Sequence, residues 1–327
     1  MSAVAVGNPP PALQEWASRI QDLRQRTLSE VSQVVVGMDK VVHRFLIALL
    51  ANGHVLLEGV PGVAKTTLSK TLAQLLGLQF HRIQFTPDLL PSDVTGTYIF
   101  DRKTNDFTLR KGPLFCQMLL ADEVNRAPAK TQSALLEAMQ ENQATIEGTT
   151  LPLPQPFMVL ATQNPVEQEG VYRLPEAQLD RFLVRIEMGY PGAQHEIEML
   201  KVHSRPVAPV ECLFTPDVIL EAQAQLANVY GKSELLQYIV DLAEASREHR
   251  DLALGASPRA SLCLLKCARA RALLDGRTYF THEDVQAVAL SVLGHRLILR
   301  PEAEVEGRTI KDVVRELLQS VAVLETK

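Results

Sequence analysis

Residues 54–66 decide the fold of this chain, and they read HVLLEGVPGVAKT. A short, continuous apolar run comes first, and the pattern after Lys65 is that of a helix. The small residues between them allow successive backbone N–H groups to turn toward a bound phosphate. A strand, a small-residue loop, a lysine and a hydroxyl in this order predict a phosphate-binding loop, in which Lys65 reaches the β- and γ-phosphates and Thr66 binds Mg²⁺.

The predicted loop and the start of its helix are nine consecutive residues. They are Gly59, Val60, Pro61, Gly62, Val63, Ala64, Lys65, Thr66 and Thr67. The loop departs from the usual pattern at Ala64, where a second glycine is common. This position must therefore adopt a backbone conformation that a methyl group tolerates. A plain strand–turn–helix junction is the alternative interpretation.

Similar apolar runs recur at residues 81–85, 117–121, 157–162 and 183–187. Continuous apolarity is typical of strands that are covered on both faces, so the five runs predict a parallel sheet. Helical patterns separate several of them, which predicts an α/β fold with ligands at the carboxyl ends of the strands. Segments 96–110 and 143–151 place strand-forming residues around polar turns and predict two inserted β-hairpins.

Beyond Pro191 the pattern is helical, apart from an irregular link near residues 205–214. Thr215, Ser257 and Thr281 mark helix starts, because each is a hydroxyl followed by a first-turn proline or, three residues later, by an acid. We expect a disordered start at residues 1–10, an α/β nucleotide-binding domain at residues 11–205 and an all-helical lid domain at residues 206–327.

The composition excludes several classes of protein. The 327 residues include 33 Lys and Arg against 38 Asp and Glu, a net charge of −5, and no basic tract, so nucleic acid is not an expected partner. Four cysteines without zinc-site spacing predict reduced thiols, with Cys263 and Cys267 on one buried helix face. Neither a signal peptide nor an apolar run of roughly 20 residues is present, which predicts a cytoplasmic protein without a membrane span.

Carboxylates and an amide follow two of the predicted strands. Residues 118–123 read MLLADE, so Asp122 can hold Mg²⁺ through its water shell while Glu123 polarises an attacking water. Acids at strand ends are common, but beside a phosphate loop the pair favours hydrolysis. After residues 157–162, Asn164 either orients the attacking water or contacts the γ-phosphate, or it only satisfies the turn before Pro165.

These motifs resemble those of the MoxR family of AAA+ ATPases. The resemblance also rests on residues 122–128 (DEVNRAP), residues 174–182 (LPEAQLDRF), the two hairpins and the helical lid. The resemblance runs from about Val35 to the C-terminus. It implies a homo-oligomeric ring, usually a hexamer, with each ATP between neighbouring subunits.

The resemblance also assigns individual residues. Asn164 matches the water-sensing position, Arg181 the finger that reaches the neighbour's γ-phosphate, and Arg259 the lid sensor. Val36 and Gly37 resemble the segment that lines the adenine pocket.

Three arginines have more than one interpretation. Arg126 is a rival trans-acting arginine, or else a strut that ties its loop to the next helix. Arg181 could instead form a surface ion pair with Glu176 or Asp180. Arg259 could be a plain surface residue, and whether it serves its own site or a neighbour's stays open.

The function that the resemblance implies is an ATP- and Mg²⁺-dependent ATPase that remodels or matures client proteins, typically with a von Willebrand factor A domain partner. The hairpins either contact substrate or pack their aromatic side chains on their own core. Two other functions stay open. One is a chelatase-type motor subunit or an MCM-like DNA motor, and the other is a nucleotide-gated scaffold with little turnover, against which the pair Asp122 and Glu123 argues.

Overall fold

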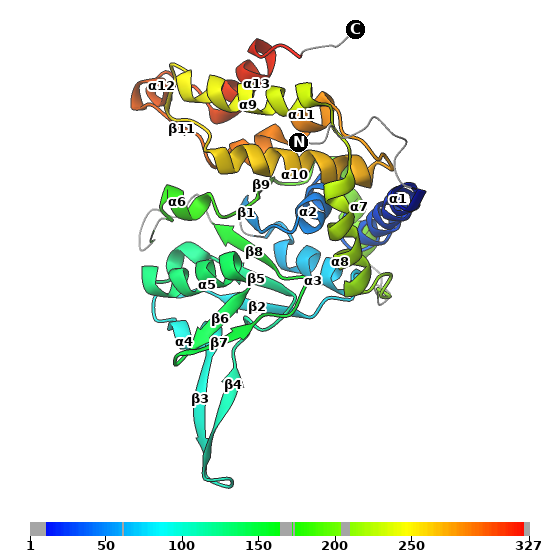
Figure 1. Ribbon diagram of the computed structural model, residues 1–327. Helices are drawn as coiled ribbons and strands as arrows, with labels where there is room; N and C mark the ends of the chain where they lie inside the picture. The colour runs from blue at the N-terminus through cyan, green and yellow to red at the C-terminus, as the bar shows by residue number, and fades with distance from the viewer. Residues whose placement is uncertain (1–10, 61, 164–171, 173, 204–209, 324–327) are drawn as a thin grey trace, which may run out of the picture. The chain divides into compact units, whose positions relative to one another are not determined.

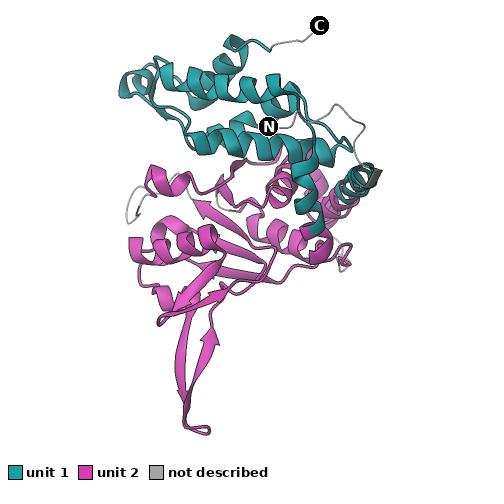
Figure 2. Cartoon of the chain, viewed as in Figure 1, with its two compact units in different colours: residues 1–25, 221–327 teal, residues 26–220 magenta. Residues whose placement is uncertain are grey.

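The computed structural model describes residues 11–60, 62–163, 172, 174–203 and 210–323 (Figure 1). The chain divides into two compact units, residues 26–220 and residues 1–25 together with 221–327 (Figure 2). Helix α1 (Pro11–Ser32) contributes to both. The expected disordered start at residues 1–10 lies outside the described residues, and the division at residues 205/206 stays a prediction.

A five-stranded sheet forms the centre of unit 26–220, in the order β2-β5-β8-β1-β9 with every neighbouring pair parallel. Its strands are β1 (Val55–Gly59), β2 (Phe80–Gln84), β5 (Met118–Asp122), β8 (Met158–Gln163) and β9 (Val184–Met188). The three inner strands bury nearly all their apolar side chains, as continuous apolar runs require. The α/β fold with a parallel five-stranded sheet is therefore confirmed.

Helices precede, connect or follow these strands in unit 26–220. They are α2 (Asp39–Leu50), α3 (Lys65–Leu75), α4 (Pro91–Thr95), η1 (Val124–Arg126), α5 (Ala129–Glu141), α6 (Glu176–Leu179) and α7 (Ala193–His203). Helix α5 begins after Pro128 and buries Leu135 and Leu136 in the same cluster as Leu119 and Val159 of the sheet. This packing fixes the carboxyl ends of the strands relative to α5.

The edge strand β2 differs from the inner strands. Ile83 is buried, whereas Arg82 and Gln84 on either side of it are exposed. This alternation arises because β2 is the outermost strand and part of it lies open. The open part carries two polar side chains toward the end of the sheet where ligands bind.

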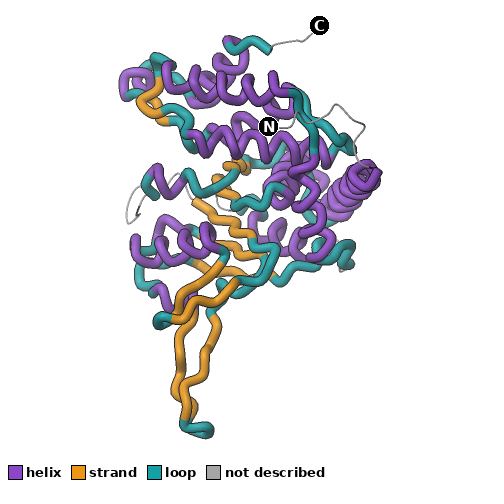
Figure 3. The backbone as a smooth tube through the Cα atoms, viewed as in Figure 1, coloured by secondary structure: helices purple, strands orange, loops and turns teal. Residues whose placement is uncertain are grey.

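Both predicted hairpins are present, and Figure 3 shows the longer one projecting from unit 26–220. One joins β3 (Gly96–Asp101) to β4 (Asp106–Lys111), and the other joins β6 (Gln143–Ile146) to β7 (Thr149–Pro152). Tyr98 at the base of the first packs against the core. Near its tip, the rings of Phe100 and Phe107 pair edge to face at 5.4 Å and are 46% and 63% exposed. Only the base of this hairpin packs its aromatic side chain on the core.

The other unit is mostly helical. After α8 (Pro216–Gln225), which spans the boundary, it contains η2 (Leu226–Asn228), α9 (Ser233–Glu248), α10 (Pro258–Leu274), α11 (His282–Leu293), α12 (Pro301–Val305) and α13 (Ile310–Ser320). The expected hydroxyl residues precede α8, α10 and α11, and Ser257 caps α10 by accepting from the N–H of Ala260. Cys263 and Cys267 are both buried on α10, so their predicted shared face is confirmed.

One feature of this unit corrects the expectation that the lid is entirely helical. Strand β10 (Leu252–Leu254) pairs antiparallel with β11 (Ile298–Leu299). These strands are three and two residues long, which is too short for a period of two to stand out in the sequence.

None of the helices in the described part of the chain is long and apolar enough to cross a membrane.

Candidate nucleotide site

A cavity of about 370 Å³ lies where strands of the sheet end and α3 begins. It is lined by Gly59, Gly62, Ala64, Lys65, Thr66, Thr67, Arg82, Gln84, Asp122, Glu123, Thr162 and Gln163. The structure therefore brings the predicted loop and both predicted carboxylates to one place. That place is the carboxyl end of a parallel sheet, where α/β folds bind ligands.

The loop before α3 takes its shape from two residues with left-handed backbone. Gly62 has φ of 85° and Ala64, the N-cap of α3, has φ of 58°. Left-handed geometry costs a non-glycine residue roughly 1–2 kcal/mol, so alanine is tolerated at this position but not favoured. Thr66 and Thr67 in the first turn also line the cavity. The unsatisfied N–H groups of that turn favour an anion.

Lys65 supplies the ammonium group of the cavity. Its Nζ donates a hydrogen bond to the Gly59 carbonyl. Burial lowers the pKa of Lys65 below its ordinary value, and the carboxylates of Asp122 and Glu123 oppose this shift. A phosphate beside Nζ would further favour the charged form, because opposite charges stabilise each other where water is partly excluded.

Thr162 joins the two carboxylates. Its buried Oγ1 donates to Oδ1 of Asp122 at 2.6 Å and accepts from the backbone N–H of Glu123 at 2.8 Å. Glu123 has φ of 55°, a left-handed conformation that is uncommon for this residue type. Backbone strain of this kind is concentrated at functional sites. Here the Thr162 hydroxyl stabilises the strained conformation by accepting the N–H of Glu123.

Edge strand β2 contributes two partners for these carboxylates. Arg82 donates to Oδ2 of Asp122 from Nε at 3.1 Å and from Nη2 at 2.7 Å. Gln84 donates from Nε2 to Oε2 of Glu123 at 2.7 Å. Arg126 reaches the same Glu123 oxygen at 3.1 Å, so its guanidinium pairs with the acid of its own chain.

Three site residues were not predicted from the sequence, namely Arg82, Gln84 and Thr162. The first two depend on the register of β2 against β5, which sets Gln84 opposite Asp122. A single sequence does not give that register. Two polar residues in alternate positions of a predicted strand, just before its carboxyl end, were the available signal.

Other predicted residues lie elsewhere. Arg181 donates from Nη1 to the Leu136 carbonyl at 2.8 Å and lines a separate cavity of about 300 Å³. Val36 and Gly37 lie between α1 and α2 and do not belong to the described lining of the nucleotide cavity. Arg259 is exposed in the first turn of α10, in the other unit. Pro61 and Asn164 lie outside the described residues.

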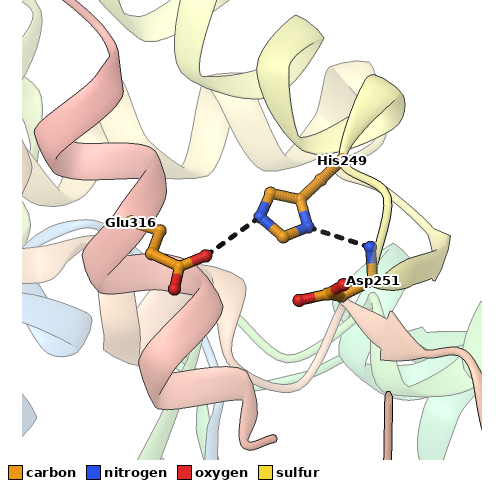
Figure 4. Close-up of side chains that lie close together, drawn as sticks. All are labelled: His249, Asp251 and Glu316. Carbon is orange, nitrogen blue, oxygen red and sulfur yellow. Dashed lines mark hydrogen bonds and ion pairs between the residues drawn. The ribbon is translucent and has the colours of Figure 1, made fainter. Parts of the chain in front are cut away.

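A second group of potential metal ligands lies in the mostly helical unit. Figure 4 shows His249, Asp251 and Glu316, whose ligand atoms lie within 4.8 Å of one another. Arg308 donates to Asp251 at 3.0 Å and to Glu316 at 2.6 Å. Because Arg308 bonds to both carboxylates and Arg250 also pairs with Asp251 at 3.4 Å, the group is best described as an ion-pair network that ties α13 to the segment before β10.

Comparison with known proteins gives the family. Residues 54–184 match the family model of ATPases associated with various cellular activities (AAA), and residues 244–317 match the AAA lid domain. The chain is 45% identical over 324 residues to Chaperone MoxR1 of Mycobacterium tuberculosis, an alignment covering 96% of this chain and 85% of that protein. The chain belongs to the MoxR family of AAA+ ATPases.

Other MoxR relatives agree over nearly the full length. Protein MoxR of Methylorubrum extorquens is 30% identical, with 94% of this chain and 96% of that protein covered. The solved structure of a candidate ATPase from Cytophaga hutchinsonii is 43% identical and superposes with a TM-score of 0.90, covering 96% of this chain and 98% of the other. The MoxR-family assignment therefore includes both the nucleotide-binding region and the lid.

Proposed function

We propose that this MoxR-family protein is a Mg²⁺-dependent ATPase. The observation that carries the proposal is the convergence, in one cavity, of Lys65 and Thr66 from the loop with Asp122 and Glu123 from the end of β5. A site that only held nucleotide would need the loop. The second carboxylate adds a base, which hydrolysis requires.

The donor set fits Mg²⁺. Thr66 and Asp122 both line the cavity and offer a hydroxyl and a carboxylate oxygen, and Mg²⁺ binds oxygen ligands and keeps several of its waters. Thr66 and Asp122 would hold Mg²⁺, which would help to neutralise the charge that develops during phosphoryl transfer.

The residues of the chain divide the remaining work. Lys65 binds the terminal phosphates of ATP, and Val36 and Gly37 border the adenine. Glu123 accepts the proton of the attacking water, with its carboxylate oriented by Gln84 and its backbone by Thr162. Asn164 orients the same water.

Two variants test this proposal by separating nucleotide binding from hydrolysis. Lys65→Ala should abolish ATP binding. Glu123→Gln should retain ATP affinity within a few-fold and lose roughly 10²–10⁴ in kcat, because it keeps the shape but removes the base. Lys70→Ala, exposed on the same helix, and Glu304→Gln, exposed on α12, are the matched controls. Unchanged binding in Lys65→Ala or near-normal turnover in Glu123→Gln would refute the proposed roles.

We further infer a homo-oligomer, a ring of six subunits, in which Arg181 reaches the nucleotide of the neighbour and Arg259 acts as the lid sensor. Two observations support the role of Arg181. It lines a cavity other than the nucleotide cavity of its own chain, and the Leu136 carbonyl holds its guanidinium in place. An arginine supplied by a neighbour in phosphoryl transfer is worth roughly 10³–10⁵ in rate.

The cellular role follows from the family. The relative named Chaperone MoxR1 supports remodelling or maturation of client proteins, and we propose a von Willebrand factor A domain protein as partner, in the cytoplasm. The exposed rings of Phe100 and Phe107 are suited to contact a client or partner.

A further inference from the structure

Both side-chain oxygens of Asp122 already accept hydrogen bonds. Oδ1 accepts from the Thr162 hydroxyl at 2.6 Å, and Oδ2 accepts from both Nε and Nη2 of Arg82. The Asp122 side chain is 15% exposed, whereas that of Arg82 is 46% exposed. The carboxylate is thus fixed in the site, and the arginine is the partner with room to move.

The strand register explains this pairing. Strand β2 runs parallel to β5 with Arg82 opposite Leu120 and Gln84 opposite Asp122. From two residues upstream, the long Arg82 side chain extends along the strand to reach the carboxylate. It also donates from Nη2 to Oε1 of Gln84 at 3.0 Å.

This arrangement sets up a competition. A metal ion or a metal-bound water that uses Oδ2 of Asp122 needs one of the two lone pairs of that oxygen. Arg82 presents two N–H donors to that oxygen and so occupies both of its lone pairs. Arg82 and the metal therefore cannot both bind Oδ2 fully. We propose that Arg82 competes with Mg²⁺ or its bound water for Oδ2 of Asp122, so that metal binding and release of Arg82 are one coupled step. The inference rests on the proposed function, because it requires Mg²⁺ and nucleotide in this cavity.

The same contacts extend the coupling to Glu123. Because Oε1 of Gln84 accepts from Arg82, its Nε2 must face the other way, and it donates to Glu123 at 2.7 Å. When Arg82 leaves, the Gln84 amide loses one of the two partners that fix its orientation. Arg82 is therefore a positioning residue. It links binding of the metal at Asp122 to the orientation of the Glu123 carboxylate.

A binding experiment tests this competition without hydrolysis. The probe is the fluorescent, non-hydrolysable analogue mant-AMPPNP, with its Kd measured once in excess EDTA and once in excess MgCl₂ on the full chain. The Kd in EDTA divided by the Kd in MgCl₂ is the Mg²⁺ ratio, and it reports how much Mg²⁺ strengthens binding of the nucleotide. Arg82→Gln should raise this ratio about three- to tenfold, the effect of removing one partly exposed charged hydrogen-bond partner.

Controls separate competition from other roles of Arg82. Arg102→Gln removes the same charge from the exposed turn of the β3–β4 hairpin and should leave the ratio unchanged. In an Asp122→Asn background, Arg82→Gln should also leave it unchanged, because the contested carboxylate is gone. If Arg82→Gln instead weakens binding equally with and without Mg²⁺, or lowers the ratio, Arg82 is a phosphate ligand or a structural residue and the inference is wrong.

Failure of the proposed function would look different. If the parent chain does not bind the probe, or if Lys65→Ala binds it equally well, then the cavity is not the nucleotide site and both proposals fail. If Lys65→Ala loses binding but Arg82→Gln leaves the ratio unaltered, only the competition is refuted.

Discussion

At the scale of single residues, Thr162 shows how much of the site depends on one buried hydroxyl. It serves as donor to Asp122 and acceptor for the backbone of Glu123. Its loss would leave a carboxylate oxygen and an N–H group without that partner. Unmet hydrogen bonds of this kind cost roughly 1–3 kcal/mol each.

We expect Thr162→Val to lower kcat by roughly 10- to 100-fold, because valine keeps the shape of the side chain and removes only the hydroxyl. Steady-state ATP hydrolysis measures the effect, and Thr145→Val, on the exposed face of β6, is the matched control. A kcat within twofold of the parent would mean that Thr162 does not position the carboxylates.

The site residues differ in how far the sequence predicts them. Lys65 and Asp122 each follow an apolar strand inside a recognisable pattern, so their meeting in one cavity is expected once the sheet is parallel. Arg82 and Thr162 carry no such pattern. Each acts on Asp122 from a neighbouring strand, and which residues face each other depends on register, which a single sequence leaves undetermined.

At the scale of elements, the start of α11 is built on a buried acid. Asp284 is fully buried and accepts from the backbone N–H of Thr281 at 2.8 Å. Arg277 donates to both of its oxygens at 2.6 Å, and Arg271 donates as well. Burial by itself raises the pKa of Asp284, but the hydrogen bonds from Arg277 and Thr281 outweigh it and hold the pKa below its ordinary value.

We expect Asp284→Asn to lower the free energy of unfolding by roughly 3 kcal/mol at pH 7, because it leaves two partly buried arginines without their common partner. A group whose pKa is depressed in the folded state stabilises above its unfolded pKa of about 3.9 and loses that contribution at lower pH. The difference in free energy of unfolding between Asp284→Asn and the parent should thus persist from pH 7 to about pH 4 and shrink below pH 4.

Urea unfolding of the full chain at several pH values measures this difference. Asp312→Asn is the matched control, because Asp312 occupies the same capping position of α13 but its side chain is 35% exposed, and its effect should be smaller. A difference between Asp284→Asn and parent that stays constant below pH 4 would contradict the ion-pair explanation.

Whole elements were the most predictable level. The two hairpins lie where the strand and turn patterns predict them, and Ser257 caps α10 through the N–H of Ala260. The pair β10 and β11 was missed because its pairing joins residues more than 40 positions apart. Local pattern does not contain such contacts.

At the scale of the whole molecule, both units match the AAA+ plan, since the family models cover residues 54–184 and 244–317. The sequence motifs predicted this organisation because each depends on local order along the chain. The roles of Arg181 and Arg259 depend on how subunits and units meet, so they stay predictions.

If neighbouring subunits complete each site, ATP turnover per subunit should collapse on dilution, because dissociated chains would lack the arginine of a neighbour. Steady-state rates of ATP hydrolysis over a wide dilution series measure turnover per subunit, with Glu123→Gln as the inactive reference. Flat activity in a chain that light scattering finds monomeric throughout the series would contradict the shared site.

We propose that Glu123 of one subunit hydrolyses ATP with help from Arg181 of another. Mixing tests it most directly, with Glu123→Gln and Arg181→Ala proteins each inactive alone. In a randomly mixed ring, about a quarter of the interfaces would join an intact Glu123 to an intact Arg181. We expect the equimolar mixture to recover up to this fraction of the wild-type rate. A mixture no more active than its two components, despite proven co-assembly, would contradict it.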